Sequence, residues 1–392
     1  MAKWKYEKKG RDRDAPSFDK IRRNKRTVKK SDLEESDFIK PIEEWTELET
    51  EKDFFIGRVV EVHKRYAFVS PEEKERSVKT RDVWLATIAR KYLLNDRMER
   101  NLIAVGDRVL CQKAMDEENN VSQDLPSCAI LHQAPRQSKI SRTDPADAGR
   151  EHILAANVDQ LVIIASFLHP KIRWGLIDRY LVLAEEQRIP AIIILNKRDL
   201  LEEAKAENEE FFLECQEKIA LYKSLQYPIF SVSTLQDNAK SGALKDIKNM
   251  LKDKISILSG HSGVGKSSLA NLFAPEIVQD VEENPDIFYK GRHTTSYASM
   301  IKLGIGGYIV DTPGIRSFLL ASRDQISLTD SFIEFRPFLG QCKFRECRHI
   351  DEPGCAVLEA IEEGKINEDR YGSYLNILTG KSSREGRVRD DY

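Results

Sequence analysis

Short apolar runs follow one another through the first third of this chain, after an N-terminus that is poor in apolar residues. Between residues 51 and 135 five runs of β type are separated by turn residues such as Ser70-Pro71 and Gly106-Asp107. The runs are Phe54–His63, Tyr66–Val69, Val83–Thr87, Arg108–Cys111 and Cys128–Leu131. Five short strands within roughly 85 residues predict a small closed β-barrel of the OB type.

Barrels of this type bind oligonucleotides through a strand face and its loops, using basic and aromatic side chains. The candidates here are Arg58, Lys64, Arg65, Tyr66 and Phe68. Aromatic residues also fill barrel cores, and we expect this of Phe68 and Trp84, whereas Lys64, Arg65 and Tyr66 are better suited to a ligand. The barrel is therefore a candidate nucleic-acid-binding domain.

From residue 151 to residue 320 strand and helix patterns alternate, which predicts a parallel sheet covered by helices. Strands are expected at Leu161–Ser166, Ala191–Leu195, Tyr227–Val232, Ile255–Leu258 and Gly307–Val310, and helices at 174–187, 202–225, 241–252 and after residue 266. Ligands of such sheets bind at the carboxyl ends of the strands, so motifs that follow the strands are expected to share one site.

The fourth of these strands leads into Gly260-His261-Ser262-Gly263-Val264-Gly265-Lys266-Ser267-Ser268, which fits the phosphate-loop pattern G-x-x-x-x-G-K-[ST]. Glycines let successive N–H groups turn toward one anion, and the following helix points its positive N-terminus there. Lys266 would neutralise the β- and γ-phosphates, and the Ser267 hydroxyl would ligate Mg²⁺. A glycine-rich turn without a ligand is the alternative, but the flanking strand and helix favour a nucleoside triphosphate site.

Asn196-Lys197-Arg198-Asp199 follows the second strand and fits the pattern N-K-x-D. The Asp199 carboxylate can accept hydrogen bonds from guanine N1–H and the exocyclic amine, whereas adenine presents an acceptor at the first position. Asn196 would tie neighbouring loops together, and the Lys197 stem would pack over the base. The hydroxyl-rich loop that starts at Ser231 is suited to approach a base edge. Four such residues alone often form an ordinary polar loop, but beside a phosphate loop they indicate guanine specificity.

Two further motifs are expected to sense the γ-phosphate. Gly291-Arg292-His293-Thr294-Thr295 lies in a segment with little apolar periodicity, and Thr294 or Thr295 could supply a second Mg²⁺ ligand. Asp311-Thr312-Pro313-Gly314 follows the last strand, where Asp311 would hold Mg²⁺ directly or through water and the Gly314 N–H could contact the γ-phosphate. Read alone, the second motif is only a turn.

The order of the motifs is unusual for a GTPase domain, in which the phosphate loop normally comes first and N-K-x-D comes late. Here Asn196–Asp199 precedes the phosphate loop, and Asp311–Gly314 ends the domain. The same sheet would form from a chain in which the N- and C-termini of the usual domain are joined and new termini are opened at another surface position. We therefore expect a domain attached after residue 314 to be coupled mechanically to the nucleotide state.

Near the C-terminus three thiols and one imidazole gather within fourteen residues: Cys342, Cys347, His349 and Cys355. Four nitrogen or sulfur ligands match a closed tetrahedral zinc site of the structural kind. Unrelated core cysteines are the alternative, but the charged residues between them make this segment too polar for a core. Cys111, Cys128 and Cys215 lie apart and are expected to be ordinary buried thiols.

Charge and composition describe the remaining segments. The formal net charge is −2, but residues 1–30 hold thirteen Lys and Arg against four Asp and Glu. Residues 1–50 are expected to be disordered, either a basic arm that binds nucleic acid or a solvated tail that aids solubility. Residues 136–150 lack an apolar period and are expected to be a linker. No apolar run reaches the roughly 18–20 residues of a membrane span, and the cysteine pattern favours a reducing cytoplasm.

Together these features resemble the ribosome small-subunit-dependent GTPase A family of circularly permuted GTPases, over about residues 54–375. The resemblance rests on Asn196–Asp199, Gly260–Ser268, Gly291–Thr295, Asp311–Gly314 and the set of Cys342, Cys347, His349 and Cys355. It implies a multidomain chain, with an OB-type β-barrel at 51–135, a circularly permuted α/β P-loop GTPase domain at 151–320 and a zinc-binding helical domain at 321–392. It also implies GTP hydrolysis stimulated by the small ribosomal subunit, contact with its rRNA and a role in its late maturation. We expect a monomer that binds no membrane.

The group that catalyses hydrolysis is the open point of this prediction. Where many GTPases place a water-orienting Gln after D-x-x-G, this chain has Ile315, which cannot orient water. Either His293 or a group supplied by the ribosome is expected to replace it, although a His in this loop can also serve only for packing. Two other classes are a GTP-switched RNA-binding protein with little catalysis and an ATPase. Turnover with purified subunits separates the first from an enzyme, and the effect of Asp199→Asn on nucleotide preference tests the second.

Overall fold

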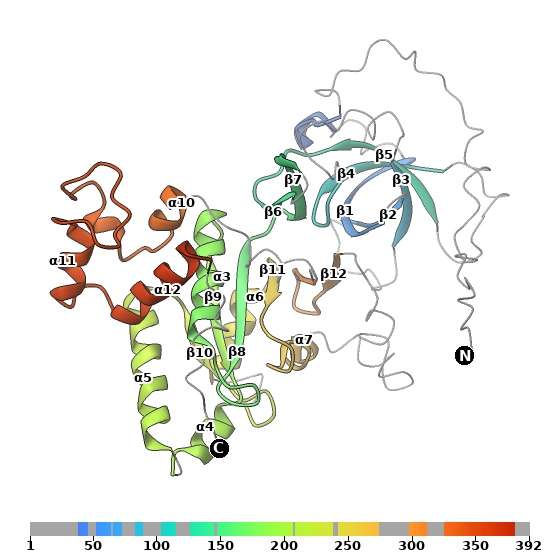
Figure 1. Cartoon of the computed structure of the whole chain (residues 1–392). Helices are drawn as coiled ribbons and strands as arrows, with labels where there is room; N and C mark the ends of the chain where they lie inside the picture. The colour runs from blue at the N-terminus through green and yellow to red at the C-terminus, as the bar shows by residue number, and fades with distance from the viewer. Residues whose placement is uncertain are drawn as a thin grey trace, which may run out of the picture. The chain divides into compact units, whose positions relative to one another are not determined.

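The computed structural model describes residues 38–45, 52–63, 66–72, 83–88, 103–114, 126–144, 147–206, 208–237, 242–273, 298–311 and 325–380. Two compact units divide the chain (Figure 1). The first contains residues 1–58, 64–95 and 108–135, and the second contains residues 59–63, 96–107 and 136–392. Among the described residues, no helix combines the length and the apolar character needed to cross a membrane.

A five-stranded barrel forms the first unit. Its strands follow one another in the order β1 (Phe54–Val62), β2 (Tyr66–Pro71), β3 (Trp84–Ile88), β5 (Ser127–Gln133) and β4 (Arg108–Lys113). The barrel closes because β4 also pairs with β1, from Phe54 opposite Gln112 to Arg58 opposite Arg108. Strands β3 and β5 run parallel, while β2–β3 and β4–β5 are antiparallel. The predicted barrel of five short strands is confirmed.

Aliphatic side chains such as Leu110 and Ile130, not aromatic rings, fill this barrel. Ala67, Val69 and Cys111 are fully buried, whereas Phe68 and Trp84 are only half-buried. The Trp84 ring lies 5.0 Å from that of Phe55, and Phe68 meets Tyr66 edge-on at 5.6 Å. The expectation that Phe68 and Trp84 fill the core is wrong, because a barrel of so few strands is narrow.

Part of the N-terminal arm is ordered against the barrel. Ile39 bridges to Gln133, and a 3₁₀ helix, η3, spans Ile42–Trp45. Phe38 and Trp45 are each 1% exposed, and Trp45 packs into a small apolar cluster with barrel residues. The expected disorder of residues 1–50 is therefore wrong for 38–45, since a few widely spaced rings anchor a segment without creating an apolar period. The remaining residues of the arm lie outside the described part.

A six-stranded sheet forms the centre of the second unit, in the order β10-β9-β8-β11-β13-β12. The strands are β8 (Gln160–Ser166), β9 (Ala191–Asn196), β10 (Ile229–Ser231), β11 (Ile255–Ser259), β12 (Ser299–Lys302) and β13 (Tyr308–Asp311). Neighbouring strands are parallel except β12 and β13, which are antiparallel. The predicted α/β fold is thereby confirmed.

Helices cover both faces of this sheet. One layer holds α3 (Trp174–Glu186) and α5 (Glu209–Ser224), and the other holds α6 (Gly242–Leu251) and α7 (Lys266–Phe273). Alternate residues of β8 point to opposite layers, with Leu161 and Ile163 toward the first and Val162 and Ile164 toward the second. Burial on both faces explains why the central strands are continuous apolar runs.

The segment expected to be a linker contains strands. β6 (Lys139–Asp144) and β7 (Asp147–Ala156) form an antiparallel ladder. Ile140 and Ile153 are buried at 0% and 1% exposure and anchor the hairpin, while polar residues surround them in the sequence. The linker prediction for 136–150 is wrong because so few apolar positions, separated by polar ones, produce no readable period.

The C-terminal part is helical, as predicted. It contains α10 (Gln325–Asp330), η4 (Arg336–Phe338), α11 (Ala356–Glu362) and α12 (Glu368–Leu378). Phe332, Phe335 and Tyr374 are each 0% exposed and form its core, which also includes Val182 of α3. This part therefore packs directly on the first helical layer of the sheet.

Candidate functional site

The Asn196–Asp199 motif, the loop after Ser231, the phosphate loop and the Asp311 backbone lie at one edge of the sheet. β9 ends at Asn196, β10 at Ser231, β11 at Ser259 and β13 at Asp311. Because these strands run parallel, the loops that follow them lie at the same end, where open α/β sheets bind their ligands.

The phosphate loop turns sharply between β11 and α7. Gly263 and Gly265 have φ values of 81° and 95°, which are strained for residues with a side chain. A Cβ atom on Gly265 would lie 2.1 Å from Asn196 Nδ2, so no side chain fits there. Val264 is 2% exposed and anchors the loop in the layer of α6 and α7.

Lys266 is the first residue of α7, and Ser267 and Ser268 complete the beginning of its first turn. The Lys266 ammonium bends back over the loop and donates to the carbonyls of Gly260 at 3.2 Å and His261 at 2.9 Å. The loop therefore combines glycine conformations, a helix N-terminus and an oriented cation, which together favour an anion.

Asn196 joins the phosphate loop to the loop after β10. It is 2% exposed and donates to the Val264 carbonyl at 3.0 Å and to Thr234 Oγ1 at 3.3 Å. Its own oxygen accepts from the Thr234 N–H at 3.1 Å. Three loops at the sheet edge are thus held by one buried amide.

Asp199 lies in the first turn of α4 (Arg198–Ala204). Its Oδ1 atom is buried and has no hydrogen-bond partner among the described residues. A buried carboxylate oxygen without a donor is costly, so such an atom calls for a ligand that supplies one. The preceding Lys197 adopts the left-handed conformation, with φ of 60°, and its ammonium donates to the His169 carbonyl.

Arg198 turns toward the loop after β10. Its guanidinium pairs with Asp237 at 2.7 Å and lies 3.5 Å from the Ser231 carbonyl. Asp237 in turn accepts from the Ser233 N–H at 2.8 Å. The side chain of Arg198 therefore supports this loop, and Ser231 takes part through its backbone.

Thr234 belongs to the predicted hydroxyl-rich loop but was not among the predicted site residues, and Asp237 and His169 were not predicted at all. Thr234 could have been chosen over Ser231, because it lies further beyond the strand end in the same hydroxyl-rich loop. Nothing in the sequence marks His169, which enters through the loop between β8 and α3. His293, Thr294, Thr295 and Gly314 fall outside the described residues, and for Asp311 the backbone alone is described, opposite Ser299.

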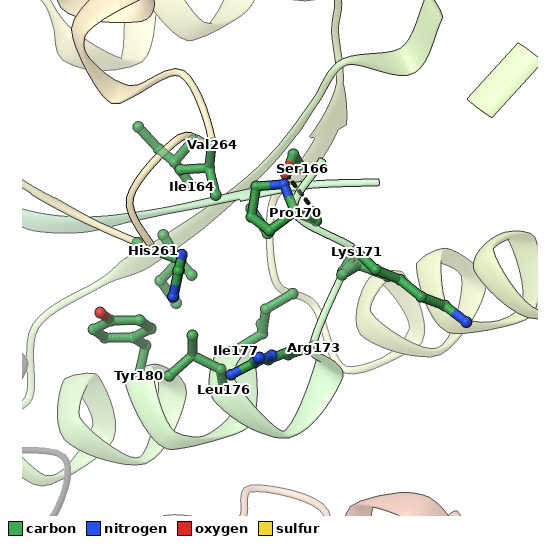
Figure 2. Close-up of a pocket in the computed structure, with 14 residues that line it drawn as sticks. Ile164, Ser166, Pro170, Lys171, Arg173, Leu176, Ile177, Tyr180, His261 and Val264 are labelled. Carbon is green, nitrogen blue, oxygen red and sulfur yellow. Dashed lines mark hydrogen bonds between the residues drawn. The ribbon is translucent and has the colours of Figure 1, made fainter. Parts of the chain in front are cut away.

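A pocket of about 40 Å³ lies between the phosphate loop and α3. Figure 2 shows the His261 ring facing Tyr180 and Leu176 across this pocket, with Ile164 and Val264 on another side. Its walls are largely apolar. The phosphate loop therefore has a side that faces α3 across this pocket, in addition to the sheet edge.

Two arginines of the barrel, one of them a predicted ligand contact, share a single carboxylate. Arg58 pairs with Glu72 at 2.7 Å, and Arg108 donates three hydrogen bonds to the same carboxylate. Tyr66 is half-buried, and Lys64 and Arg65 lie outside the described residues.

The four predicted metal ligands of the C-terminal part come together. The ligand atoms of Cys342, Cys347, His349 and Cys355 all lie within 4.8 Å of one another. His349 Nδ1 lies 3.3 Å from Cys355 Sγ and 3.6 Å from Cys342 Sγ, and the latter two sulfurs are 3.9 Å apart. These separations fit the edges of a tetrahedron around zinc, which are about 3.8 Å for two thiolates.

A metal bound by this set would find a neutral imidazole ready to ligate and would displace the thiol protons. Burial lowers the pKa of His349, so its imidazole is neutral, and burial raises the pKa of Cys347 to about 12. Thiolates gathered here need a cation to stabilise them. Tyr371 of α12 donates to the His349 carbonyl at 2.8 Å, and Glu352 accepts from the N–H groups of Arg348 and Ile350, which fixes the loop around the ligands.

Comparison with known proteins places this arrangement among circularly permuted GTPases. The family model described as RsgA GTPase matches residues 133–321. A protein of Shewanella oneidensis named small ribosomal subunit biogenesis GTPase RsgA is 41% identical over 307 residues, which cover 76% of this chain and 80% of that protein. A protein of the same name from Chlorobaculum parvum is 38% identical over 283 residues, covering 71% and 85%.

Solved structures show the same architecture. The crystal structure of YjeQ from Thermotoga maritima superposes with a TM-score of 0.61 at 30% identity, and the match covers 84% of this chain and all of that one. The structure of YloQ, described as a circularly permuted GTPase, gives a TM-score of 0.61 at 27% identity, over 86% and 98%. The motif order derived from the sequence therefore has a structural counterpart.

Proposed function

Because the chain belongs to the RsgA GTPase family, we propose that it hydrolyses GTP to GDP and phosphate in the biogenesis of the small ribosomal subunit. The relatives named above carry that role in their names, and this chain covers four fifths or more of their length. The proposal rests on the nucleotide site, and a single atom in it carries the choice of nucleotide.

That atom is the buried, unpartnered Oδ1 of Asp199. Guanine offers N1–H and an exocyclic amine, two donors that a carboxylate accepts together, whereas adenine offers no donor at N1. GTP binding would therefore supply a donor to a buried carboxylate oxygen that otherwise has none, and ATP binding would not. Lys197 would cover the base, and Asn196 would keep the loops around it in place.

The phosphate loop would hold the triphosphate. Backbone N–H groups of residues 260–265 and the N-terminus of α7 would receive the phosphates, with Lys266 exchanging its loop carbonyls for phosphate oxygens. Mg²⁺, when bound, offsets the negative charge between the β- and γ-phosphates. Ser267 and Asp311 would hold it, with Thr294 or Thr295 completing the set and Gly314 contacting the γ-phosphate.

We further propose that His293, or a group of the ribosome, orients the attacking water, since Ile315 stands where a Gln would serve. Zinc is the metal we assign to Cys342, Cys347, His349 and Cys355, because three thiols and one imidazole suit it. The partner we propose is the small subunit at a late stage, contacted through its rRNA. The protein would act as a monomer in the cytoplasm.

Turnover measurements with purified small subunits test this function. We expect slow hydrolysis by the protein alone, strong stimulation by subunits, and co-sedimentation that depends on a GTP analogue in place of GDP. The Lys266→Ala variant is the control, since it should lose both hydrolysis and nucleotide-dependent binding. Equal rates with and without subunits would contradict the proposal.

A further inference from the structure

Helix α3 stands between the phosphate loop and the C-terminal helices. On one side, Leu176, Ile177 and Tyr180 line the pocket against His261 and Val264 of the phosphate loop (Figure 2). On another side, α3 packs against α12 and α10 of the C-terminal part (Figure 1). Whatever holds the C-terminal helices on α3 therefore also acts next to the phosphate loop.

Three buried charged residues join the C-terminal helices to α3. Arg370 of α12 donates to Asp178 of α3 at 2.6 Å and forms two hydrogen bonds with Glu334, at 2.6 and 3.1 Å. The side chains of Arg370, Asp178 and Glu334 are only 2%, 3% and 6% exposed. We call these three residues the buried triad.

Neutral groups complete the surroundings of the buried triad. Tyr222 of α5 donates to Asp178 at 2.6 Å, and Ser373 of α12 donates to the second oxygen of the same carboxylate. The Arg370 guanidinium lies over the Phe332 ring, 4.7 Å from its centroid. Burial raises the pKa of Tyr222, so its hydroxyl stays a donor. Asp178 is thus bonded from α12 and from α5 at once.

A buried pair of this kind fixes position more strictly than a surface pair. Sliding α12 along α3 would leave Asp178 or Arg370 charged and unpaired away from water, which is strongly unfavourable. Two other ion pairs join the same parts, Arg336 with Glu185 and Lys218 with Asp369, but each has an exposed partner, so water can replace it. The buried triad therefore decides the placement of the C-terminal helices.

We propose that the buried triad locks the C-terminal part onto α3 as a fixed joint, and that α3 transmits the binding of a partner at that part to the phosphate loop. Asp178 and Arg370 are then positioning residues for stimulated hydrolysis. The C-terminal helices would not swing with the nucleotide state, contrary to the expectation drawn from their place in the chain. The transmission rests on the proposed function, whereas the fixed joint does not.

Asp178→Asn is the informative variant, because it removes the charge between the parts while Arg370 keeps Glu334 as its partner. Glu185→Gln is the matched control, since it breaks the exposed pair with Arg336 from the same helix. For Asp178→Asn we expect subunit-stimulated kcat to fall at least about fivefold, with the intrinsic rate, the GTP affinity and the KM for subunits unchanged. The control should behave like the parent. If Asp178→Asn only loosened the packing, the KM for subunits would rise instead. Either that result or an unchanged stimulated kcat would overturn the proposal that α3 transmits partner binding to the phosphate loop.

A covalent tether tests the joint itself and needs no ribosome. The substitutions Lys218→Cys and Asp369→Cys replace an ion pair between α5 and α12, and the two new thiols can be joined by a short bifunctional reagent, with the untethered double variant as control. A fixed joint predicts unchanged nucleotide exchange and intrinsic hydrolysis after tethering, and restored stimulation in the Asp178→Asn background. Slower nucleotide exchange or slower intrinsic hydrolysis in the tethered protein would overturn the proposal that the C-terminal part is fixed on α3. If the parent protein shows no stimulation at all, the proposed function fails while the tether still decides on the joint.

Discussion

Replacing the Asp199 carboxylate by an amide, Asp199→Asn, should convert the nucleotide preference of this protein without unfolding it. The change is nearly isosteric and touches one buried atom that has no partner among the described residues. Asp199 is half-buried and its Oδ1 atom lacks a donor, so the amide should not destabilise the free protein and the Tm should stay equal or rise. Loss of GTP binding would then report on recognition alone.

The size of the effect follows from the two hydrogen bonds that the carboxylate would receive from guanine. Hydrogen bonds to a charged group contribute about 1.5–3 kcal/mol each, and the new amide keeps one acceptor while its N–H₂ opposes the guanine amine. A loss of about 3 kcal/mol weakens GTP and GDP binding by about 150-fold. ATP gains nothing from the carboxylate, so its weak binding should not change. Xanthine carries a carbonyl in place of the guanine amine, and the amide can donate to it, so XTP should become the preferred nucleotide.

Isothermal titration of the full chain with GDP, a GTP analogue, XDP and ATP measures these affinities directly, and thermal unfolding serves as the control for folding. The reasoning would be refuted by GDP binding that weakens less than about threefold in a folded variant, which is below the cost of one charged hydrogen bond. Equal losses for GDP and ATP would also refute it, because they would place Asp199 outside the base-recognition site.

Three further outcomes test other parts of the structure. Gly265→Ala should weaken GTP binding by about 5- to 150-fold in titrations, because its Cβ would clash with Asn196 in a strained conformation, whereas Gly340→Ala, with a φ of 79° and no atom within 4 Å, should bind normally. Metal analysis should find one ion per chain, and both a chelator and Cys355→Ser should remove it and lower the Tm, whereas a metal-free chain of unchanged Tm would contradict the site. Burial raises the pKa of Cys215 to about 12, so at pH 8 it remains a neutral thiol, and a thiol reagent should modify it only after unfolding.

The residues of the proposed nucleotide site could be predicted from the sequence because the chemistry of such a site leaves little choice of residue. Only glycine fits at position 265, and only a residue with both an acceptor and a donor can join Val264 and Thr234 as Asn196 does. Such steric and hydrogen-bonding requirements fall on a few positions that are close together in the sequence, so a short motif reports them. The metal ligands were readable for the same reason, since three of the four lie within eight residues of one another.

Other features depend on partners that are remote in the chain, and no local pattern reports them. Arg370 and Asp178 are separated by 192 positions, and each alone resembles an ordinary charged residue on a helix. The order of residues 38–45 was missed because only the buried rings of Phe38 and Trp45 anchor a segment that is otherwise polar. The hairpin of β6 and β7 was missed because its buried isoleucines are few and separated by polar residues. Sequence patterns show which residues a local element needs, whereas packing between distant elements becomes visible only in three dimensions.

The strand order of the sheet also has a consequence for the protein during its own synthesis. Its central pair, β8 and β11, brings together residues such as Gln160 and Ser256, which are 96 positions apart. At translation rates of about 5–20 residues per second, β8 waits roughly 5–20 s for this neighbour. Meanwhile β8, β9 and β10 can already pair, leaving the inner edge of β8 open to wrong partners. The residues that would recognise the base are thus synthesised first, and the loop that would hold the phosphates is synthesised later. A nascent chain therefore cannot bind its nucleotide until β11 has paired with β8.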